Sequence, residues 1–478
     1  MRSPRSRVLA LLVMSFIVLL TPAAGADPES GTVSSPPGRD VTFTGGGGLR
    51  LHGTVIASAA PHSTAPGIVL VGGSGPGPRA EYLAEARAFA AAGITTLIYD
   101  KRTTGYSRTH RDLNLLADDA QAALETLRHI PGVRPDRVGL WGFSEGGWVV
   151  PLVAARSADV GFLVTLGAPG FTPLRTQTWS LAETLRHHGD TGPLAATVEG
   201  PAARLVGETG AFPAAEFDPL PALRGVHVPV LALWGDHDVQ AVPAESAAVL
   251  RNTLTGSDSV TIRFVAGAGH NGRSTTDGFD RVGAPAGPGA PKGAFAPGYL
   301  DAMTTWVDQV ANGTPPVSSA QPYPAQFLSS VDPGHGWWTS AWVQSIVLAM
   351  VLVVFLGYLP VSWMNHRPHP ARRSARRSAR LLAVCGLGSM VATVVYVESI
   401  VADDARTVGP VVAGRPLEWL ILQGLAVLTA VLLVVTASTA VRGRNEVATT
   451  SRAGLGVLLV TGCAWLAWAI TWGLFSIR

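Results

Sequence analysis

The sequence feature that most constrains this chain is a Gly-x-Ser-x-Gly motif set between a strand-like run and a helix-like run. The apolar run 138–141 ends at Gly142, Ser144 and Gly146 complete the motif, and a second apolar run covers 148–155. A strand, a tight turn and a helix in this order hold a serine hydroxyl where a base and a substrate reach it. Backbone N–H groups at the start of the helix then face the oxygen that gains negative charge in acyl transfer. Such a motif alone can also be a glycine-rich turn with a non-catalytic serine. The rest of the sequence is needed to distinguish the two interpretations.

Strand-like and helix-like segments alternate on both sides of this motif. The expected strands are 68–71, 94–99, 138–141, 160–166, 228–234 and 260–265, and the expected helices are 82–92, 113–130, 148–155, 244–252 and 298–310. This repetition predicts a mostly parallel sheet with helices on both faces. Two strand-like runs around four glycines, within 41–56, predict an antiparallel hairpin ahead of it.

The alternation lapses between residues 171 and 225, where several prolines accompany two expected helices at 178–187 and 195–206. Insertions above the C-terminal ends of parallel strands are where lids and substrate pockets lie. We therefore expect a globular domain over 40–312 with residues 171–225 as its lid.

The N-terminus is typical of a secretory signal peptide. Residues 1–26 contain three arginines, an apolar core at 8–20 and an Ala-Gly-Ala cleavage signal at 24–26. An uncleaved anchor is the alternative. The Pro- and Ser-rich residues 27–39 are expected to form a leader before the globular domain.

The C-terminal region, 341–478, follows a Pro- and Ser-rich linker at 313–340 and changes character. Its four apolar stretches have membrane-spanning length and cover 341–363, 381–402, 419–441 and 453–475. Glu398 and Gln423 are the polar exceptions, and Glu398 is expected at a solvated helix end rather than on a transport path.

The loops between these stretches predict an orientation. Residues 365–380 carry six arginines and no acidic residue, the loop 442–452 is net basic, and the loop 403–418 is mixed. The positive-inside rule puts the two basic loops in the cytoplasm and the globular domain on the outer side. The N-terminal signal predicts the same side.

The composition excludes some classes of function. The chain has 36 basic and 33 acidic residues, and its arginines crowd beside an apolar segment, which favours membrane orientation over nucleic-acid binding. The two cysteines, Cys385 and Cys463, lie in apolar C-terminal segments, so neither a disulfide in the globular domain nor a cysteine metal site is expected.

A nucleophilic serine needs a base, and the base needs an acid that orients it. One strand runs into Asp236, His237 and Asp238, and another runs into glycines and His270. Both segments end at the same sheet edge as Ser144, so these distant residues are expected to converge. A metal site at the Asp-His-Asp run is weakly supported, because adjacent side chains of an extended segment point apart.

These motifs resemble those of the α/β-hydrolase superfamily, in particular its esterase- and peptidase-like members, over about residues 41–310. The resemblance rests on Gly72–Pro76, Tyr99–Arg102 with Gly105 and Ser107, Gly142–Gly146, Gly235–Asp238 and Gly269–His270. It implies an α/β-hydrolase fold with Ser144 as nucleophile, Asp238 as acid and His270 as base. Asp236, as a turn cap or the acid, and His237, as the base, are the alternatives.

The resemblance also implies an oxyanion hole built from backbone N–H groups. Glu145 would supply one donor, and Gly73 or Ser74 the other. Many relatives carry histidine where Gly72 or Gly73 stands, which leaves the second donor open. Asp100 and Arg102 are expected to be structural, and neither a metal nor an organic cofactor is implied.

We therefore expect a multi-pass cell-membrane protein whose extracytoplasmic serine hydrolase domain cleaves carboxylic esters through an acyl-enzyme. Peptidase or thioesterase activity on the same triad is the enzymatic alternative. A non-catalytic binding or sensory domain on a membrane anchor is the alternative of another class, and a transporter is disfavoured by the charge-poor spans. The expected partners are a small ester or acyl substrate and the lipid bilayer, without nucleic acid; the sequence does not indicate a protein partner.

Overall fold

The computed structural model describes residues 38–59, 65–107, 110–280, 293–334, 336–364, 370–442 and 449–477. The expected signal peptide and nearly all of the expected leader lie outside these ranges. The chain forms two compact units. The sheet unit covers the described residues within Pro28–Ser180 and Phe212–Ser330, and the helical unit covers Leu181–Ala211 with Val331–Arg478.

The sheet unit is built on a nine-stranded sheet with the order β1-β2-β4-β3-β5-β6-β7-β8-β9. The strands are β1 (Arg39–Thr44), β2 (Arg50–Ile56), β3 (Ala65–Val71), β4 (Thr95–Tyr99), β5 (Val133–Phe143), β6 (Leu163–Leu166), β7 (Val230–Gly235), β8 (Val260–Val265) and β9 (Ser319–Ala320). β1 and β2 form the expected antiparallel hairpin, and β2 also pairs antiparallel with β4. The pairs from β4 to β9 are parallel, which confirms the predicted sheet.

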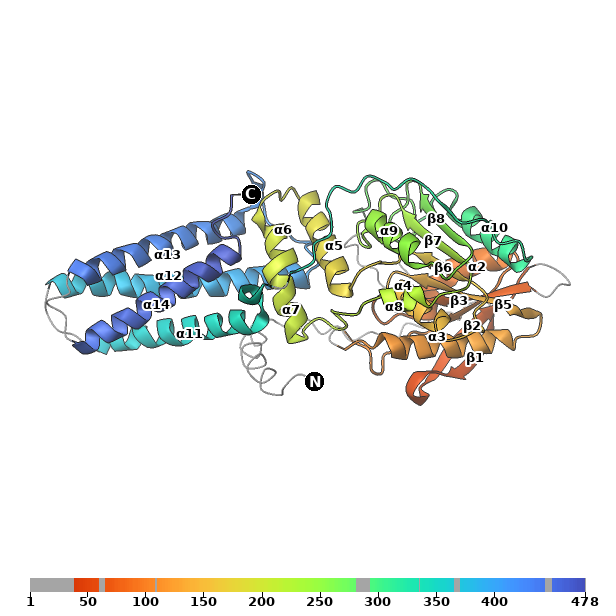
Figure 1. Ribbon diagram of the computed structural model, residues 1–478, viewed down its shortest axis with the longest axis horizontal. Helices are drawn as coiled ribbons and strands as arrows, with labels where there is room; N and C mark the ends of the chain where they lie inside the picture. Colours follow the sequence, from red (N-terminus) through yellow and green to blue (C-terminus); the bar gives the residue numbers. More distant parts are fainter. Residues whose placement is uncertain are drawn as a thin grey trace. The chain divides into compact units, whose positions relative to one another are not determined.

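Helices cover both faces of this sheet (Figure 1). On one face α3 (Leu113–Arg128), α4 (Gly146–Ala154), α8 (Leu220–Arg224) and α9 (Pro243–Thr253) share an apolar core with the strands. On the other face α2 (Leu83–Ala91), which follows the short helix η2 (Arg79–Tyr82), and α10 (Tyr299–Ala311) form a second core. The central strands are apolar on both sides because both sides are covered. The fold is therefore that of an α/β hydrolase.

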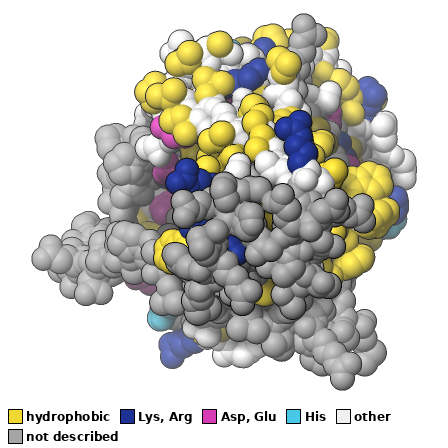
Figure 2. All heavy atoms as spheres, turned by 90° about the vertical axis from the view of Figure 1, so that its left-hand side faces the viewer, with side chains coloured by type: hydrophobic (Ala, Val, Ile, Leu, Met, Phe, Trp, Pro, Cys, Tyr) yellow, Lys and Arg dark blue, Asp and Glu magenta, His cyan; other side chains and the backbone are white. Residues whose placement is uncertain are grey.

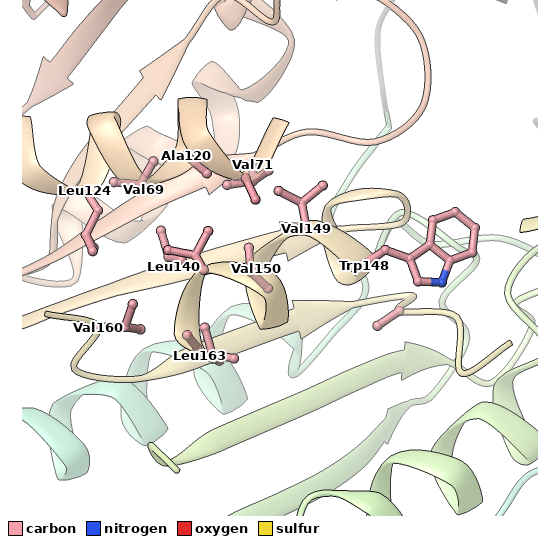
Figure 3. Packing of buried hydrophobic residues seen from close by; sticks show 14 of the residues in the cluster. Val69, Val71, Ala120, Leu124, Leu140, Trp148, Val149, Val150, Val160 and Leu163 are labelled. Atoms are coloured by element: carbon pink, nitrogen blue, oxygen red, sulfur yellow. The ribbon is translucent and has the colours of Figure 1, made fainter. Parts of the chain in front are cut away.

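The core beneath α4 explains how this helix is held. Val149 and Val150 of α4 are buried against the apolar side chains of β3 and β5 (Figure 3). Leu124 of α3 and Leu163 of β6 belong to the same cluster. Burial of a side chain of this size contributes roughly 1.5–3 kcal/mol, so the packing fixes the start of α4 and the turn before it.

The parallel register brings the strand ends to one edge of the sheet. Val71 pairs with Gly142 between β3 and β5, and Gly235 pairs with Val265 between β7 and β8. The loops that leave β3, β5, β7 and β8 therefore begin at the same edge, where open α/β sheets place their ligands.

The helical unit contains four long helices, α11 (Ala341–Met364), α12 (Pro370–Ala402), α13 (Leu417–Arg442) and α14 (Thr449–Thr471). The described part of each is long and apolar enough to cross a membrane, in agreement with the four expected stretches. Large apolar side chains such as Val353 and Val434 point outward, with 72% and 65% of their surface exposed. Figure 2, which looks at the end of this unit, shows hydrophobic side chains over much of its described surface. Such a surface is expected of helices that face lipid.

The insertion differs from the expected lid. Before α8, it contains α5 (Pro173–His187), α6 (Pro193–Thr197), the single π-turn η3 (Val198–Ala202) and α7 (Ala203–Thr209). Residues Leu181–Ala211 belong to the helical unit rather than to the sheet unit. The Thr197 hydroxyl donates to the Trp472 carbonyl oxygen at 2.9 Å, and the Glu208 carboxylate accepts from the Ala341 N–H at 2.7 Å. The sequence predicted two helices in this segment, but it could not indicate which apolar partner they bury against.

The expected linker at 313–340 also differs from a free connection. Its residues 319 and 320 form β9 beside β8. The Ser330 hydroxyl donates to Glu245 of α9 at 2.6 Å, and Trp179 donates to the Leu328 carbonyl oxygen at 2.8 Å. The segment therefore follows the sheet unit up to Ser330 before the chain enters the helical unit.

Candidate active site

Ser144 lies on a strained turn between β5 and α4. Its backbone has φ = +52°, a left-handed conformation that is rare for a residue with a side chain. A Cβ on Gly142 would lie 2.5 Å from the Gly146 carbonyl oxygen, and a Cβ on Gly146 would lie 2.3 Å from the Val71 carbonyl oxygen. Neither position has room for a side chain, because the backbone of a neighbouring segment lies too close. The turn places the serine hydroxyl at the edge of the sheet.

A chain of hydrogen bonds connects Ser144, His270 and Asp238. His270 Nε2 lies 2.9 Å from the Ser144 hydroxyl oxygen, and His270 Nδ1 lies 2.8 Å from Asp238 Oδ2. The three residues come from the β5–α4 turn, the loop after β8 and the loop after β7. The structure thus brings together the three residues that the sequence predicted as nucleophile, base and acid.

Asp238 is held for contact with His270. It is 4% exposed, and its Oδ1 accepts the backbone N–H groups of Gln240 at 2.8 Å and Ala241 at 3.1 Å. This leaves Oδ2 for the imidazole. Asp236 and His237, the alternatives, have half-exposed side chains and pair loosely with each other at 3.9 Å. The structure places neither of them in the chain of hydrogen bonds.

Ser144 and His270 open into a cavity of about 300 Å³ in the sheet unit. Its wall includes the aromatic side chains of Tyr82, Trp141 and Phe143. The Phe143 ring lies 5.0 Å from the His270 ring, centroid to centroid, and 6.1 Å from that of Trp141. Glutamates, Arg273 and loop residues complete a wall of mixed polarity. The cavity has the size of a small-molecule site.

The two expected oxyanion donors on the loop after β3 are not equivalent. The Gly73 N–H donates to the Tyr82 hydroxyl at 2.9 Å, so it is already used. Among the described residues, the N–H groups of Ser74 and Glu145 have no acceptor. This favours Ser74 over Gly73 as the second donor. The sequence left both donors open because the hydrogen bond from Gly73 to a tyrosine hydroxyl nine residues away cannot be assigned from sequence.

Burial raises the pKa of Tyr82, so its hydroxyl stays protonated. The Tyr82 hydroxyl oxygen accepts the Gly73 N–H, so the hydroxyl proton is not used in that hydrogen bond. Tyr82 also lines the cavity at Ser144.

The carboxylate of Glu145, directly after the nucleophile, is buried in a cluster that sequence reasoning missed. It is 0% exposed and pairs with Lys101, with Arg111 Nε at 2.8 Å, and with the Tyr106 hydroxyl at 2.9 Å. The Ser74 hydroxyl lies 3.4 Å away. Only one signal could have pointed to this cluster: Lys101 is one of two lysines in a chain that otherwise uses arginine.

A second buried ion pair holds the loop that carries His270. Arg273, three residues after the histidine, pairs with Glu85 of α2, and both residues are at most 5% exposed. Arg273 also donates to the Gly293 carbonyl oxygen at 3.0 Å, and its carbonyl oxygen accepts from the Gly269 N–H at 2.9 Å. These contacts fix the loop on both sides of the imidazole.

Asp100 and Arg102 have the structural contacts that were expected of them. Asp100 pairs with Arg79 at 2.7 Å, and Arg102 forms a buried pair with Asp119 and donates to the Gly46 carbonyl oxygen. Within the described ranges, no three metal-binding side chains gather as an ion site. The site offers the kinds of group that acyl transfer uses: a serine hydroxyl beside an imidazole, and backbone N–H groups next to the serine.

The chain is similar to several known proteins. Residues 82–283 match the prolyl oligopeptidase family, Peptidase_S9. The chain is 29% identical over 262 residues to an uncharacterized protein of Mycobacterium tuberculosis, covering 54% of this chain and 80% of that protein. It is 34% identical over 154 residues to a polyketide transferase of Stachybotrys chlorohalonatus, covering 30% and 50%. Among solved structures, 2,6-dihydroxy-pseudo-oxynicotine hydrolase is similar with a TM-score of 0.41 and 16% identity, over 61% of this chain and 73% of that one.

Proposed function

We propose that this chain, an α/β hydrolase fused to four apolar helices, is a membrane-anchored serine hydrolase that cleaves carboxylic esters. The family match supports a serine hydrolase. The observation that carries the proposal is the pair of contacts from His270, at 2.9 Å to the Ser144 hydroxyl and at 2.8 Å to Asp238. Such a relay turns a weakly nucleophilic hydroxyl into one that attacks a carbonyl carbon.

The proposed reaction has two steps. His270 takes the proton of Ser144 while the serine oxygen bonds to the substrate carbonyl carbon, and Asp238 stabilises the imidazolium. The N–H groups of Glu145 and Ser74 hold the oxyanion. Its collapse expels the alcohol, which receives the proton from His270. Water then attacks the acyl-enzyme by the same route and releases the carboxylic acid and free Ser144.

A peptidase is the second candidate, and the match of residues 82–283 to the prolyl oligopeptidase family favours it. The same groups cleave an amide if His270 protonates the leaving amine efficiently. The test uses matched substrates with one acyl group, for example butyryl p-nitrophenyl ester and butyryl p-nitroanilide, on the full-length chain in detergent. Ester hydrolysis with far slower anilide hydrolysis supports the esterase; comparable kcat/KM on peptide anilides supports the peptidase.

We propose a multi-pass position in the cell membrane with the sheet unit on the extracytoplasmic side. Four helices of spanning length and the arginine-rich loop at 365–380 support it. A membrane-impermeant fluorophosphonate on intact cells tests this orientation. Labelling of intact cells supports it, and labelling that requires lysis puts the sheet unit in the cytoplasm.

A further inference from the structure

The loop after β3 presents one peptide group to the site in a defined way. This peptide consists of the Gly73 carbonyl and the Ser74 N–H. Gly73 lies against the nucleophile, since a Cβ on it would be 3.3 Å from Ser144 Cβ, and Ser74 lines the same cavity as Ser144. Among the described residues the Ser74 N–H has no acceptor. It is therefore available to the substrate oxygen.

The other end of this peptide is bound by a cation. Lys101 Nζ donates to the Gly73 carbonyl oxygen. A positive charge on the carbonyl oxygen draws electron density through the amide and makes its N–H a stronger hydrogen-bond donor. The donor strengthened in this way is Ser74, because its N–H belongs to the same peptide.

Lys101 is itself held by the residue that follows the nucleophile. Its ammonium group pairs with Glu145 Oε1 and lies 3.3 Å from the Tyr106 hydroxyl. Tyr106 in turn accepts the Gly75 N–H at 2.9 Å and lies 2.9 Å from Glu145 Oε1. One cluster thus ties the loop after β3 to the turn that carries Ser144, and these two segments supply the two oxyanion donors.

Two cations and one carboxylate lie at the centre of this cluster. Lys101 and Arg111 together face the single carboxylate of Glu145, which is fully buried. Glu81 is a further acidic group near Lys101. The effect on an oxyanion therefore depends on where the ammonium group lies, at the Gly73 carbonyl oxygen, and not on a net charge of the cluster.

The choice of lysine suits this role. The three protons of the ammonium group match three acceptors, which are the Gly73 carbonyl, the Glu145 carboxylate and the Tyr106 hydroxyl. A planar guanidinium group cannot point its donors in these three directions from one nitrogen. Lys101 is one of only two lysines in the sequence.

We propose that Lys101 is a positioning residue of the oxyanion hole, acting on the Ser74 N–H through the Gly73 carbonyl and anchored by Glu145. The proposal rests on the serine hydrolase function above. Lys101 does not touch the substrate; it orients and polarises the donor that does. Removing its charge is expected to weaken binding of the oxyanion more than binding of the neutral substrate.

The test compares wild type with Lys101→Met in the full-length chain, using p-nitrophenyl butyrate and a trifluoromethyl ketone analogue that forms a tetrahedral adduct. We expect kcat to fall about 10- to 50-fold in Lys101→Met with KM nearly unchanged, a fraction of the effect of losing a donor outright. The inhibition constant of the ketone should rise by a similar factor. Lys101→Arg should recover part of the loss, since it keeps the charge.

Asp119→Asn is the matched control. It weakens the neighbouring buried pair with Arg102, which does not contact residues 73–75. It should lower the unfolding temperature while kcat and the ketone inhibition constant stay near those of wild type. If Lys101→Met does not fold, Glu145→Gln is measured in its place. We expect kcat to fall and the ketone inhibition constant to rise in this variant too, because the ion pair that positions Lys101 is lost.

Each outcome decides a separate question. A folded Lys101→Met protein with wild-type kcat and ketone affinity overturns the positioning role and leaves the hydrolase function standing. The same is true of a folded Glu145→Gln protein with unchanged values. Wild type that neither hydrolyses the ester nor reacts with fluorophosphonate contradicts the hydrolase function itself. A kcat loss shared equally by Asp119→Asn means that Lys101 acts only through stability.

Discussion

The Nδ1 atom of His270 lies 2.8 Å from Oδ2 of Asp238, a residue 32 positions earlier in the chain and on a different loop. The other carboxylate oxygen is occupied by two backbone N–H groups. The carboxylate therefore fixes which imidazole nitrogen carries the proton and leaves Nε2 free to accept the proton of Ser144.

The first prediction separates the two aspartates of the loop after β7. Asp238→Asn should lower kcat by about 10³- to 10⁴-fold, because an amide in this place favours the wrong imidazole tautomer. Asp236→Asn is the matched control and should stay within a few-fold of wild type, since its side chain is half-exposed and outside the relay. Steady-state ester kinetics measure both. Equal losses of kcat in the two variants would show that the substitutions disturb the loop after β7 and not the hydrogen bond between Asp238 and His270.

The second prediction concerns the turn that carries Ser144. In Gly146→Ala the new methyl group would lie 2.3 Å from the Val71 carbonyl oxygen, so either the turn or β3 must shift. We expect a loss of about 2–4 kcal/mol in the free energy of unfolding and loss of activity. Gly200→Ala, where no atom lies within 4 Å of the new Cβ, should be nearly neutral. Thermal unfolding and ester turnover report the two effects, and a fully active Gly146→Ala protein would contradict the described geometry.

The third prediction is a pH effect at Lys101. Burial lowers the pKa of Lys101, an effect that the neighbouring Glu145 opposes. Arg111, Glu81 and Tyr106 are the other ionisable groups near it. The ammonium group should therefore lose its proton below the usual lysine range, and kcat should fall as pH rises through that point. Lys101→Arg keeps its charge and should lack this alkaline decline. Superimposable kcat profiles between pH 7 and 10 would contradict the prediction.

The fourth prediction concerns stability of the helical unit. Burial, with a contribution from nearby Glu183, raises the pKa of Glu199 to about 7. The folded state then holds a proton that the unfolded state has lost, so stability falls as pH rises from about 4.5 to 7. Glu199→Gln removes this dependence. At pH 8 the variant should be more stable by about 1–2 kcal/mol, allowing for solvent screening, and below pH 4.5 it should match wild type.

Thermal unfolding midpoints of the full-length chain, measured in detergent across this pH range, check the fourth prediction. The exposed Glu216 provides the control variant Glu216→Gln, which should behave as wild type at every pH. A wild-type midpoint that rises between pH 5 and 8, relative to Glu199→Gln, would contradict the sign of the effect.

The sequence predicted those parts of the site that depend on chain direction and strand order. Ser144, Asp238 and His270 each follow a strand whose apolar run is readable, and parallel strands bring such ends together. The choice between Gly73 and Ser74 could not be made from sequence, because the Tyr82 hydroxyl that accepts the Gly73 N–H comes from a helix start that no periodicity connects to it. The Glu145 cluster was missed for the same reason, since Lys101, Tyr106 and Arg111 lie in a loop without periodic pattern.

The lid shows a different limit of sequence reasoning. The sequence indicated helices in this segment, but it did not specify what they pack against. Leu194 and Val198 are buried in the core of the helical unit, together with residues more than 150 positions later. Composition suggested a boundary near residue 340, whereas the structure assigns Leu181–Ala211 to the later unit.

The measurement that tests the central claim most directly is fluorophosphonate labelling of the full-length chain, with the labelled residue located by peptide mass spectrometry. Wild type should carry one phosphonyl group on Ser144, and its ester hydrolysis should be lost in proportion to labelling. Ser144→Ala should be unlabelled and inactive, while Ser157→Ala, on the surface after α4, should react as wild type does. Undiminished labelling or ester hydrolysis in a folded Ser144→Ala protein would contradict the account.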